Sequence, residues 1–532
     1  MRYNLLFVVV CFVLLAPFIM AQKSDEKGQK TTVTIEHADY MEGAERFGKN
    51  VQALFGNVKF SHQETLMFCD SAFFHRDSNM VHAHGHVHLI QADSVHLYGD
   101  LLRYFANDEM AEVRDNVKMV NDDVVLTTEF LDYDRKHNVA YYFNGGEIVN
   151  GDNNLISELG YYFPNSDEVH FRDSVVVINP DYTIHSDTLQ YNTVSKIVKI
   201  VGPTTIYSEE NTIYSELGFY DTENDLAQLE KNSSVKGVEQ QLFGDTIYYN
   251  RNNGFGEVFS NMALHDTTNN VIIKGDYGYY NEITKRALTT KRALMLQIQN
   301  EDTLFLHADT LRLDPLETDS STNQLVRAYY NVKFFREDFQ GRCDSMVYNT
   351  VDSTNTFYKG PILWAMGNQM SANVIKLYTK NNELDKAEFF DNSFIVSPEA
   401  DSIHLYNQIK GRNMVGYIKD NDLYKVDVDG NSQAIYYPKD KGVIIGMNKA
   451  EASNMTILLE KQQVKGIILR QEPSGNLNPP FLVLEDQRKL VGFRWLDHYR
   501  PKKKEDIFIV EVVTETAEQF DYSQFQFDKT MP

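Results

Sequence analysis

The chain is poor in cysteine, in tryptophan and in positive charge. It has three cysteines and two tryptophans in 532 residues, and its formal net charge is −24. So large an excess of acid argues against nucleic acid as a partner. The sequence also lacks a nucleophile elbow, a phosphate-binding glycine loop and a zinc-ligand pattern, so we expect no enzyme and no cofactor.

Long apolar segments are missing beyond the first residues. Arg2 begins a short positive start, 5–16 is apolar, and Ala21 is a small residue suited to cleavage. This pattern predicts a signal peptide over 1–21. The apolar run is short for a membrane span, and an uncleaved anchor is the alternative. We therefore expect an exported, soluble protein.

What is present is a carboxylate that recurs along the chain with a spacing close to 29 residues between Asp70 and Asp245 and a looser spacing afterwards. A small residue precedes the acid, and an aromatic residue usually follows four positions later. The acids are Asp39, Asp70, Asp100, Glu129, Glu158, Asp187, Glu216, Asp245, Asp276, Asp309 and Asp344. Such a period predicts one structural unit stacked many times.

Each repeat reads as two extended strands joined by turns. Residues 123–133 and 139–149 are rich in β-forming residues, and the polar segments 134–138 and 150–154 separate them. Arg135 is expected to be exposed in the first of these turns. Apolar alternation slips by one residue at each acid, which predicts a bulge or corner where the strand crosses from one sheet to another.

These features predict an all-β fold, an elongated and stacked antiparallel β-jelly roll with two strands in each repeat of about 29 residues. A closed parallel β-helix is the alternative. We predict one array over 33–314, a continuation or second array over 322–470, and a linker with a partly flexible C-terminal extension over 471–532. The basic run 500–504 is expected to be a solvated tail.

Cys69 and Cys343 are nine repeats apart and both occupy the small position before the acid. One strand spacing per repeat already separates them by about 40 Å, which exceeds the reach of a disulfide. We therefore predict no disulfide within the chain.

Stacked Gly-Asn-Val strands, as at 56–58, and the recurring pattern Gly-Asp-x-Leu-x-Tyr, as at 99–104, resemble the OstA-like family, which includes the LptA-type periplasmic proteins of lipopolysaccharide transport. The resemblance covers most of 33–470. It implies a jelly roll in the periplasm, associated in some arrangements with the outer membrane. Its apolar interior would carry the acyl chains of lipopolysaccharide, docked end to end with similar jelly rolls. The chain is much longer than the short bridge proteins of that family.

The inward apolar positions are the candidate ligand-binding residues. Ordinary core packing is the alternative for each of them. They are Leu97, Leu102, Tyr104, Leu126, Leu131, Tyr133, Leu155, Tyr162, Ile184, Leu189 and Tyr191.

Other clusters point more weakly to function. The recurring acids lie about 10 Å apart by strand spacing, too far to share a calcium ion. The alternating histidines of 82–88 could bind a divalent metal weakly, but no companion ligands are evident, so we predict no metal site. A non-enzymatic carrier of lipopolysaccharide is the first interpretation. A structural or adhesive repeat scaffold is the second, and a polysaccharide-cleaving β-helix enzyme is the third.

Overall fold

A computed structural model describes residues 31–43, 45–92, 94–299, 302–316, 324–380, 383–399, 404–419, 422–460, 463–479 and 482–509. The predicted signal peptide lies outside these ranges. The chain divides into two compact units, 1–144 and 145–532, which we call unit 1 and unit 2. In the described ranges no helix is long and apolar enough to cross a membrane.

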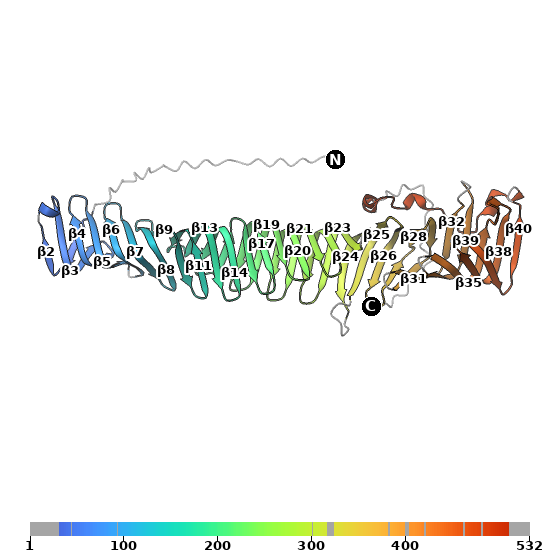
Figure 1. Ribbon diagram of the computed structural model, residues 1–532, viewed down its shortest axis with the longest axis horizontal. Coiled ribbons are helices and arrows are strands. Elements are labelled where there is room, and N and C mark those ends of the chain that lie inside the picture. The colour runs from blue at the N-terminus through green and yellow to red at the C-terminus, as the bar shows by residue number, and fades with distance from the viewer. Residues whose placement is uncertain are drawn as a thin grey trace, which may run out of the picture. The chain divides into compact units, whose positions relative to one another are not determined.

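Unit 1 consists of strands that follow one another along the array, drawn in blue in Figure 1. Its elements are β1 (Thr34–His37), β2 (Tyr40–Glu42), η1 (Glu45–Phe47), β3 (Val51–His62), β4 (Thr65–His75), β5 (Met80–Gln91), β6 (Val95–Phe105), β7 (Met110–Asn121), β8 (Val124–Asp134) and β9 (Val139–Tyr142).

Unit 2 begins with short and long strands in alternation and then has a run of long strands. These elements are β10 (Gly146–Asn150), β11 (Asn153–Ser157), β12 (Leu159–Phe163), β13 (Glu168–Asn179), β14 (Tyr182–Asn192), β15 (Ile197–Ile200), β16 (Thr204–Ser208), β17 (Thr212–Ser215), β18 (Leu217–Asp221), β19 (Leu226–Lys236), β20 (Gln240–Asn250), β21 (Phe255–Asp266), β22 (Val271–Asn281), β23 (Arg286–Gln299), β24 (Asp302–Pro315), β25 (Gln324–Arg336) and β26 (Phe339–Asn349).

The rest of unit 2 continues the array and ends in three short 3-10 helices. Its elements are β27 (Thr354–Tyr358), β28 (Ile362–Ala365), β29 (Asn368–Ser371), β30 (Val374–Lys380), β31 (Glu383–Phe390), β32 (Ser393–Pro398), β33 (Tyr406–Gly411), β34 (Asn413–Lys419), β35 (Asp422–Tyr436), β36 (Lys439–Asp440), β37 (Val443–Ile444), β38 (Met447–Glu460), β39 (Gln463–Arg470), β40 (Ser474–Asn478), η3 (Glu485–Arg488), η4 (Asp497–Tyr499) and η5 (Lys504–Phe508).

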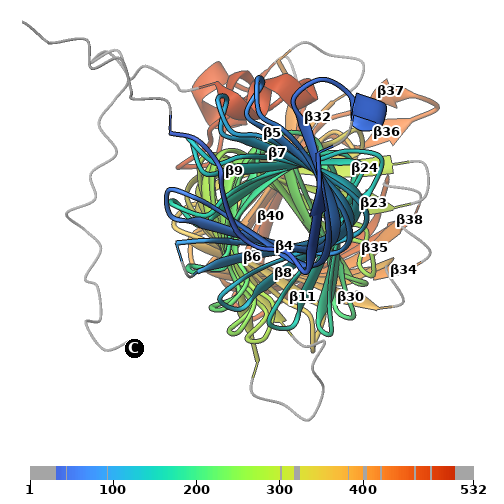
Figure 2. The ribbon, with the colours of Figure 1, turned by 90° about the vertical axis from the view of Figure 1, so that its left-hand side faces the viewer.

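Neighbouring strands pair in antiparallel fashion. This confirms the predicted antiparallel jelly roll and excludes the alternative fold, the parallel β-helix. In unit 1, β3 to β8 pair in chain order. In unit 2, two consecutive short strands often replace one long strand. For example, β11 and β12 both pair with β13, and β17 and β18 both pair with β19. Figure 2, seen along unit 1, shows its bent strands wrapping around the core.

A corner interrupts the pairing in the middle of each long strand pair. Between β3 and β4 the register shifts between Phe55 and Val58, and Gly56 and Asn57 both have positive φ. The shift recurs between His84 and Val87 of β5, whose Gly85 and His86 also have positive φ. Two residues therefore face one at the corner, and the inward side of the strand changes phase there, as predicted.

Six of the recurring acids, Asp39, Asp70, Asp100, Glu216, Asp245 and Asp309, accept a side-chain hydrogen bond from the second left-handed residue of such a corner. Asn116 Nδ2 donates to Asp100 at 2.6 Å, Asn261 Nδ2 to Asp245 at 2.7 Å and Asn331 Nδ2 to Asp309 at 2.8 Å. Backbone amides at a corner can also donate to an acid. Asn116 N to Glu129 Oε2 at 3.2 Å is such a bond, whereas asparagine side chains supply the three above.

Glycine at a corner makes room for this acid. A Cβ on Gly85, whose φ is +75°, would lie 2.4 Å from the Asp70 carboxylate, and a Cβ on Gly56 would lie 2.4 Å from that of Asp39. The corner glycine of one strand and the acid of the neighbouring strand therefore act together. They allow the strand to turn from one arm of the jelly roll to the other.

The division into arrays at 314–322 stays a prediction. β24 and β25 pair with each other on either side of this segment. In the predicted linker at 471–480 the structure has a strand, β40, which pairs with β38. Residues 482–509, which we call the strap, lie on unit 2, where Val483 and Leu490 join a buried cluster with Phe394 and Tyr437.

Candidate ligand-binding interior and its seam

All eleven predicted ligand-binding residues lie in the interior, each at most 2% exposed. Six of them belong to unit 1 and five to unit 2. The structure therefore brings them to the inward face of the jelly roll, repeat after repeat, as an apolar ladder with a tyrosine on most rungs. Whether a ligand contacts them stays a prediction, since side chains packed in a core have the same burial.

Two rows of hairpin turns meet along one edge of the jelly roll, and we call this edge the seam. In unit 1 the seam is closed by polar side chains. His62 Nδ1 lies 2.6 Å from the Tyr104 hydroxyl, and these residues come from opposite rows. Burial raises the pKa of Tyr104 to about 12, so this phenol stays neutral.

Arg135 makes four polar contacts across this seam. The expectation that it is exposed in its turn was wrong. It is 7% exposed. Its guanidinium donates to the His62 carbonyl oxygen at 2.9 Å, to Thr65 Oγ1, and to Gln63 Oε1 at 2.5 Å. It also forms an ion pair with Glu109 at 3.0 Å. A turn residue therefore reaches across the seam because buried carbonyl and hydroxyl oxygens there need a donor.

The charge of Arg135 alters the groups around it. Its hydrogen bond is the main reason that the pKa of Glu109 is lowered. Burial, followed by the charge of Arg135, lowers the pKa of His62. At neutral pH this part of the seam therefore holds one ion pair and a neutral histidine.

In unit 2, tyrosines cross the seam to amides. Tyr191 donates its hydroxyl proton to Asn150 Oδ1 at 3.0 Å and accepts from Asn153 Nδ2 at 3.1 Å. Asn211 Nδ2 donates to the Tyr249 hydroxyl at 2.8 Å, and the Tyr280 hydroxyl donates to Gln240. Burial is the main cause that raises the pKa of each of these three tyrosines. The seam tyrosines are thus uncharged, with their rings toward the interior and their hydroxyl groups at the edge.

Further along unit 2, buried glutamines of the strands hydrogen-bond to the backbone of the strap. Gln408, 0% exposed, donates to the carbonyl oxygen of Arg488 at 2.7 Å and accepts from the amide of Leu490 at 2.8 Å. Gln369 makes the same pair of bonds to Arg494 O and Leu496 N, at 2.8 and 2.7 Å.

Three further contacts extend the strap toward β24. Arg500 Nε donates to Gln340 Oε1 at 2.8 Å. The expectation that this basic run is a solvated tail was therefore wrong for Arg500. Lys333 Nζ donates to the Ile509 carbonyl oxygen at 2.7 Å, and the Phe508 ring lies 4.7 Å from that of His307. The strap therefore follows the array from β38 back to β24.

At the last two tyrosine bridges, those of Tyr249 and Tyr280, lies a cavity of about 320 Å³. Its floor is apolar and includes Val235, Leu242 and Leu264, with Tyr249 and Tyr280 beside them. The rim holds Glu210, Glu239, Gln240, Glu282 and Lys285.

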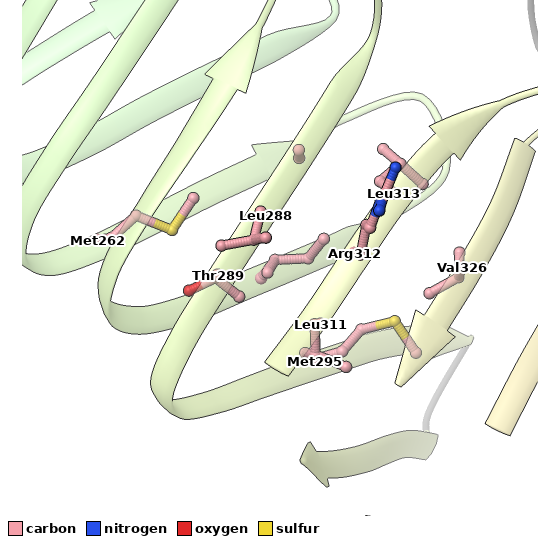
Figure 3. A pocket seen from close by; sticks show the side chains of 10 residues that line it. Met262, Leu288, Thr289, Met295, Leu311, Arg312, Leu313 and Val326 are labelled. Atoms are coloured by element: carbon pink, nitrogen blue, oxygen red, sulfur yellow. The ribbon is translucent and has the colours of Figure 1, made fainter. Parts of the chain in front are cut away.

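The next part of the interior has only a small space, and Figure 3 shows side chains that line it. Met262, Met295, Leu311 and Leu313 are among the residues around a space of only about 10 Å³ there. A space of that size holds one water molecule at most and no ligand.

The other candidate clusters have structural roles in the described residues. No group of three or more histidine, cysteine or carboxylate residues is placed there to hold a metal ion. The corner at Gly85 divides the histidine run, and His86 instead hydrogen-bonds Asp70 at 2.8 Å. Cys69 and Cys343 are both free and buried.

A comparison with family models matches the model described as OstA-like protein to residues 30–187 and 197–297. No curated protein matches. Twelve chains of known structure match. One is the crystal structure of LptH from Pseudomonas aeruginosa, whose title describes it as the LptA homologous periplasmic component of the conserved lipopolysaccharide transport device. It is 16% identical, the match covers 31% of this chain and 79% of that chain, and the TM-score is 0.11.

Proposed function

Because this chain belongs to the OstA-like family, we propose that it is a non-enzymatic periplasmic protein that carries or shields the lipid part of lipopolysaccharide on its way to the outer membrane. The observation that carries the proposal is the apolar ladder, which repeats its aliphatic and tyrosine side chains through both units. An acyl chain in water costs about 0.8 kcal/mol for each exposed CH₂ group, so a carrier must offer apolar surface over the length of the chain.

The seam supports the same function. Its tyrosines, asparagines and glutamines hydrogen-bond one another at the edge, whereas the interior behind them is apolar. Side-chain bridges of this kind can open one at a time, because each is separate from the backbone pairing of the strands. A lipid whose acyl chains lie inside and whose sugars stay in water would replace these bridges locally.

The ends of the array support docking with similar jelly rolls. The edge strand β40 pairs with β38, and all five of its residues are exposed. An exposed strand edge can add a strand from a partner. We propose that related jelly-roll proteins of the envelope dock there, end to end.

Purified full-length protein tests the proposal directly. Lipopolysaccharide is titrated against the protein carrying a photoreactive residue at Leu102 or Leu189, with exposed Lys118 as the control position. We expect saturable adducts from the two inward positions alone. Equal adducts from all three positions, or none, would contradict the carrier function, and none would favour a structural scaffold of the envelope.

A further inference from the structure

Glycine occupies one inward position where the neighbouring strands carry a larger side chain. Val198 and Ala227 are the inward neighbours of Tyr220, and Gly256 and Ala287 are those of Tyr280. Gly256 pairs with both Tyr249 and Tyr280, and Leu242 packs against it, since a Cβ on Gly256 would lie 2.8 Å from Leu242 Cδ2. The 320 Å³ cavity lies there and Gly256 lines it.

Two exposed aliphatic side chains lie beside the residues that line the cavity. Val238, on the rim and 89% exposed, belongs to one row of turns. Ile283, 66% exposed, belongs to the other row. Isolated apolar residues on a surface are common. Val238, however, lines the cavity together with Val235, Leu242 and Leu264, and Ile283 follows the lining residue Glu282 in the chain. A volume of about 320 Å³ is near the lower end of the roughly 300–1,000 Å³ of small-molecule sites.

The seam is fastened on both sides of this cavity. Before it, Tyr191 bridges to Asn150 and Asn153. After it, the strap covers the edge from Ile509 onward through Gln340, Gln369 and Gln408. At the cavity itself, the bridges of Tyr249 to Asn211 and of Tyr280 to Gln240 cross the seam.

The charges on the rim of the cavity determine which polar group of a ligand can lie there. Glu210, Glu239 and Glu282 line the rim together with Lys285, whose Nζ lies 3.7 Å from Glu239 Oε2, and the charge of Arg251 acts on Glu210. Tyr249 donates to Glu282 at 3.2 Å. The remaining negative charge would repel a phosphate at the rim, whereas hydroxyl, amide and amine groups can donate hydrogen bonds to these carboxylates.

We propose that the cavity beside Gly256 is the entrance through which a single alkyl chain, attached through a neutral or cationic polar group, reaches the interior. The inference rests on the proposed carrier function and adds to it the site of entry and the chemistry of the entering end. The chain passes Val238, lies against Leu242 and Leu264, and displaces the Tyr280–Gln240 bridge.

Photolabelling of the full chain tests this entrance. The probes are a straight-chain alcohol, an alkylamine and an alkyl phosphate of equal length, each with a diazirine near the end of the chain. We expect the alcohol and the amine to label residues 235–264 and the phosphate to label them weakly. Gly256→Leu adds a side chain to the lining of the cavity and should reduce the labelling roughly tenfold, since two methylene groups of the probe no longer fit.

A second pair of variants guards against misfolding of Gly256→Leu, whose Cβ would lie 2.8 Å from Leu242 Cδ2. Val238→Ser changes an exposed rim residue and should weaken labelling, whereas Val194→Ser, at a valine 69% exposed in another turn, should leave it unchanged. Labelling elsewhere in the interior, equal in all variants, would overturn the entrance and leave the carrier function standing. No labelling of the wild-type chain by any probe would overturn both.

Discussion

Arg135→Ala should open the first repeats of unit 1 without unfolding the rest of the chain. The substitution removes an ion pair with Glu109 and three hydrogen bonds to buried or half-buried oxygens. Loss of one partner of a buried pair costs 3–5 kcal/mol, and Glu109 keeps some solvent, so we expect the lower end, about 3 kcal/mol.

Two native thiols report on the two units separately. Cys69 lies on β4, in the hairpin that Arg135 holds through His62 and Thr65, and Cys343 lies on β26 of unit 2. Burial raises the pKa of Cys69 to about 12, so the closed state does not react. Alkylation then follows the population of the opened hairpin.

Mass spectrometry of alkylated peptides gives the rate at each cysteine. A cost of about 3 kcal/mol predicts that Cys69 reacts roughly 100-fold faster in Arg135→Ala, with Cys343 unchanged. Lys136→Ala, an exposed neighbour in the same turn, is the matched control and should leave both rates as they are. An unchanged Cys69 rate, or equal acceleration of both cysteines, would refute the role assigned to Arg135.

Three other predictions concern the strap, the seam histidine and the thiols. Gln408→Leu removes two hydrogen bonds to the strap, which together contribute about 2 kcal/mol, so hydrogen exchange at the Leu490 amide should accelerate roughly 30-fold; unchanged protection would show that the glutamine does not hold the strap. The pKa of His62 is lowered from 6.5, so its contribution to stability is complete above pH 6.5 and is lost as the pH falls through the folded-state pKa; thermal melting should fall with acidification, less steeply in His62→Gln, and identical pH profiles would contradict this assignment. In the denatured but unreduced chain, Cys69 and Cys343 should both react with iodoacetamide, and a bond between them within one chain would overturn the stacked geometry.

The sequence predicted the backbone well because a repeat reports the same environment many times. The phase slip at each acid, read from Leu97, Gly99 and Leu102, is the corner that the structure places there. All eleven inward residues were found from the same alternation. A single buried residue in a single strand would have given no such signal.

The seam escaped sequence reasoning because it is made of polar residues that look like loop residues. Asn153, Asn211 and Gln240 follow hairpin turns at repeat positions where unit 1 has Val95 and Val124. That substitution of amides for valines was a usable signal, since the same positions are inward. Arg135 was missed for another reason: its long side chain leaves an ordinary turn sequence and finds partners more than 60 residues away.

The strap was missed because its partners belong to strands far away in the sequence. Gln369 bonds residues 494 and 496, and Gln408 bonds residues 488 and 490. The sequence of the strap has no strand period, and its 3-10 helices are short. Gln340 and Gln369, which both bind the strap, are one repeat length apart in the sequence. This spacing was the available sequence signal for the strap.

The central claim, an interior that holds lipid, is tested most directly at two adjacent tyrosines of β12. Tyr162 is 1% exposed and points inward, whereas Tyr161 is 43% exposed and points outward. A photoreactive residue is placed at one or the other in living cells, and the adducts are identified after irradiation. We expect lipopolysaccharide adducts at the Tyr162 position and none at the Tyr161 position. Lipid on neither position, or equally on both, would contradict it.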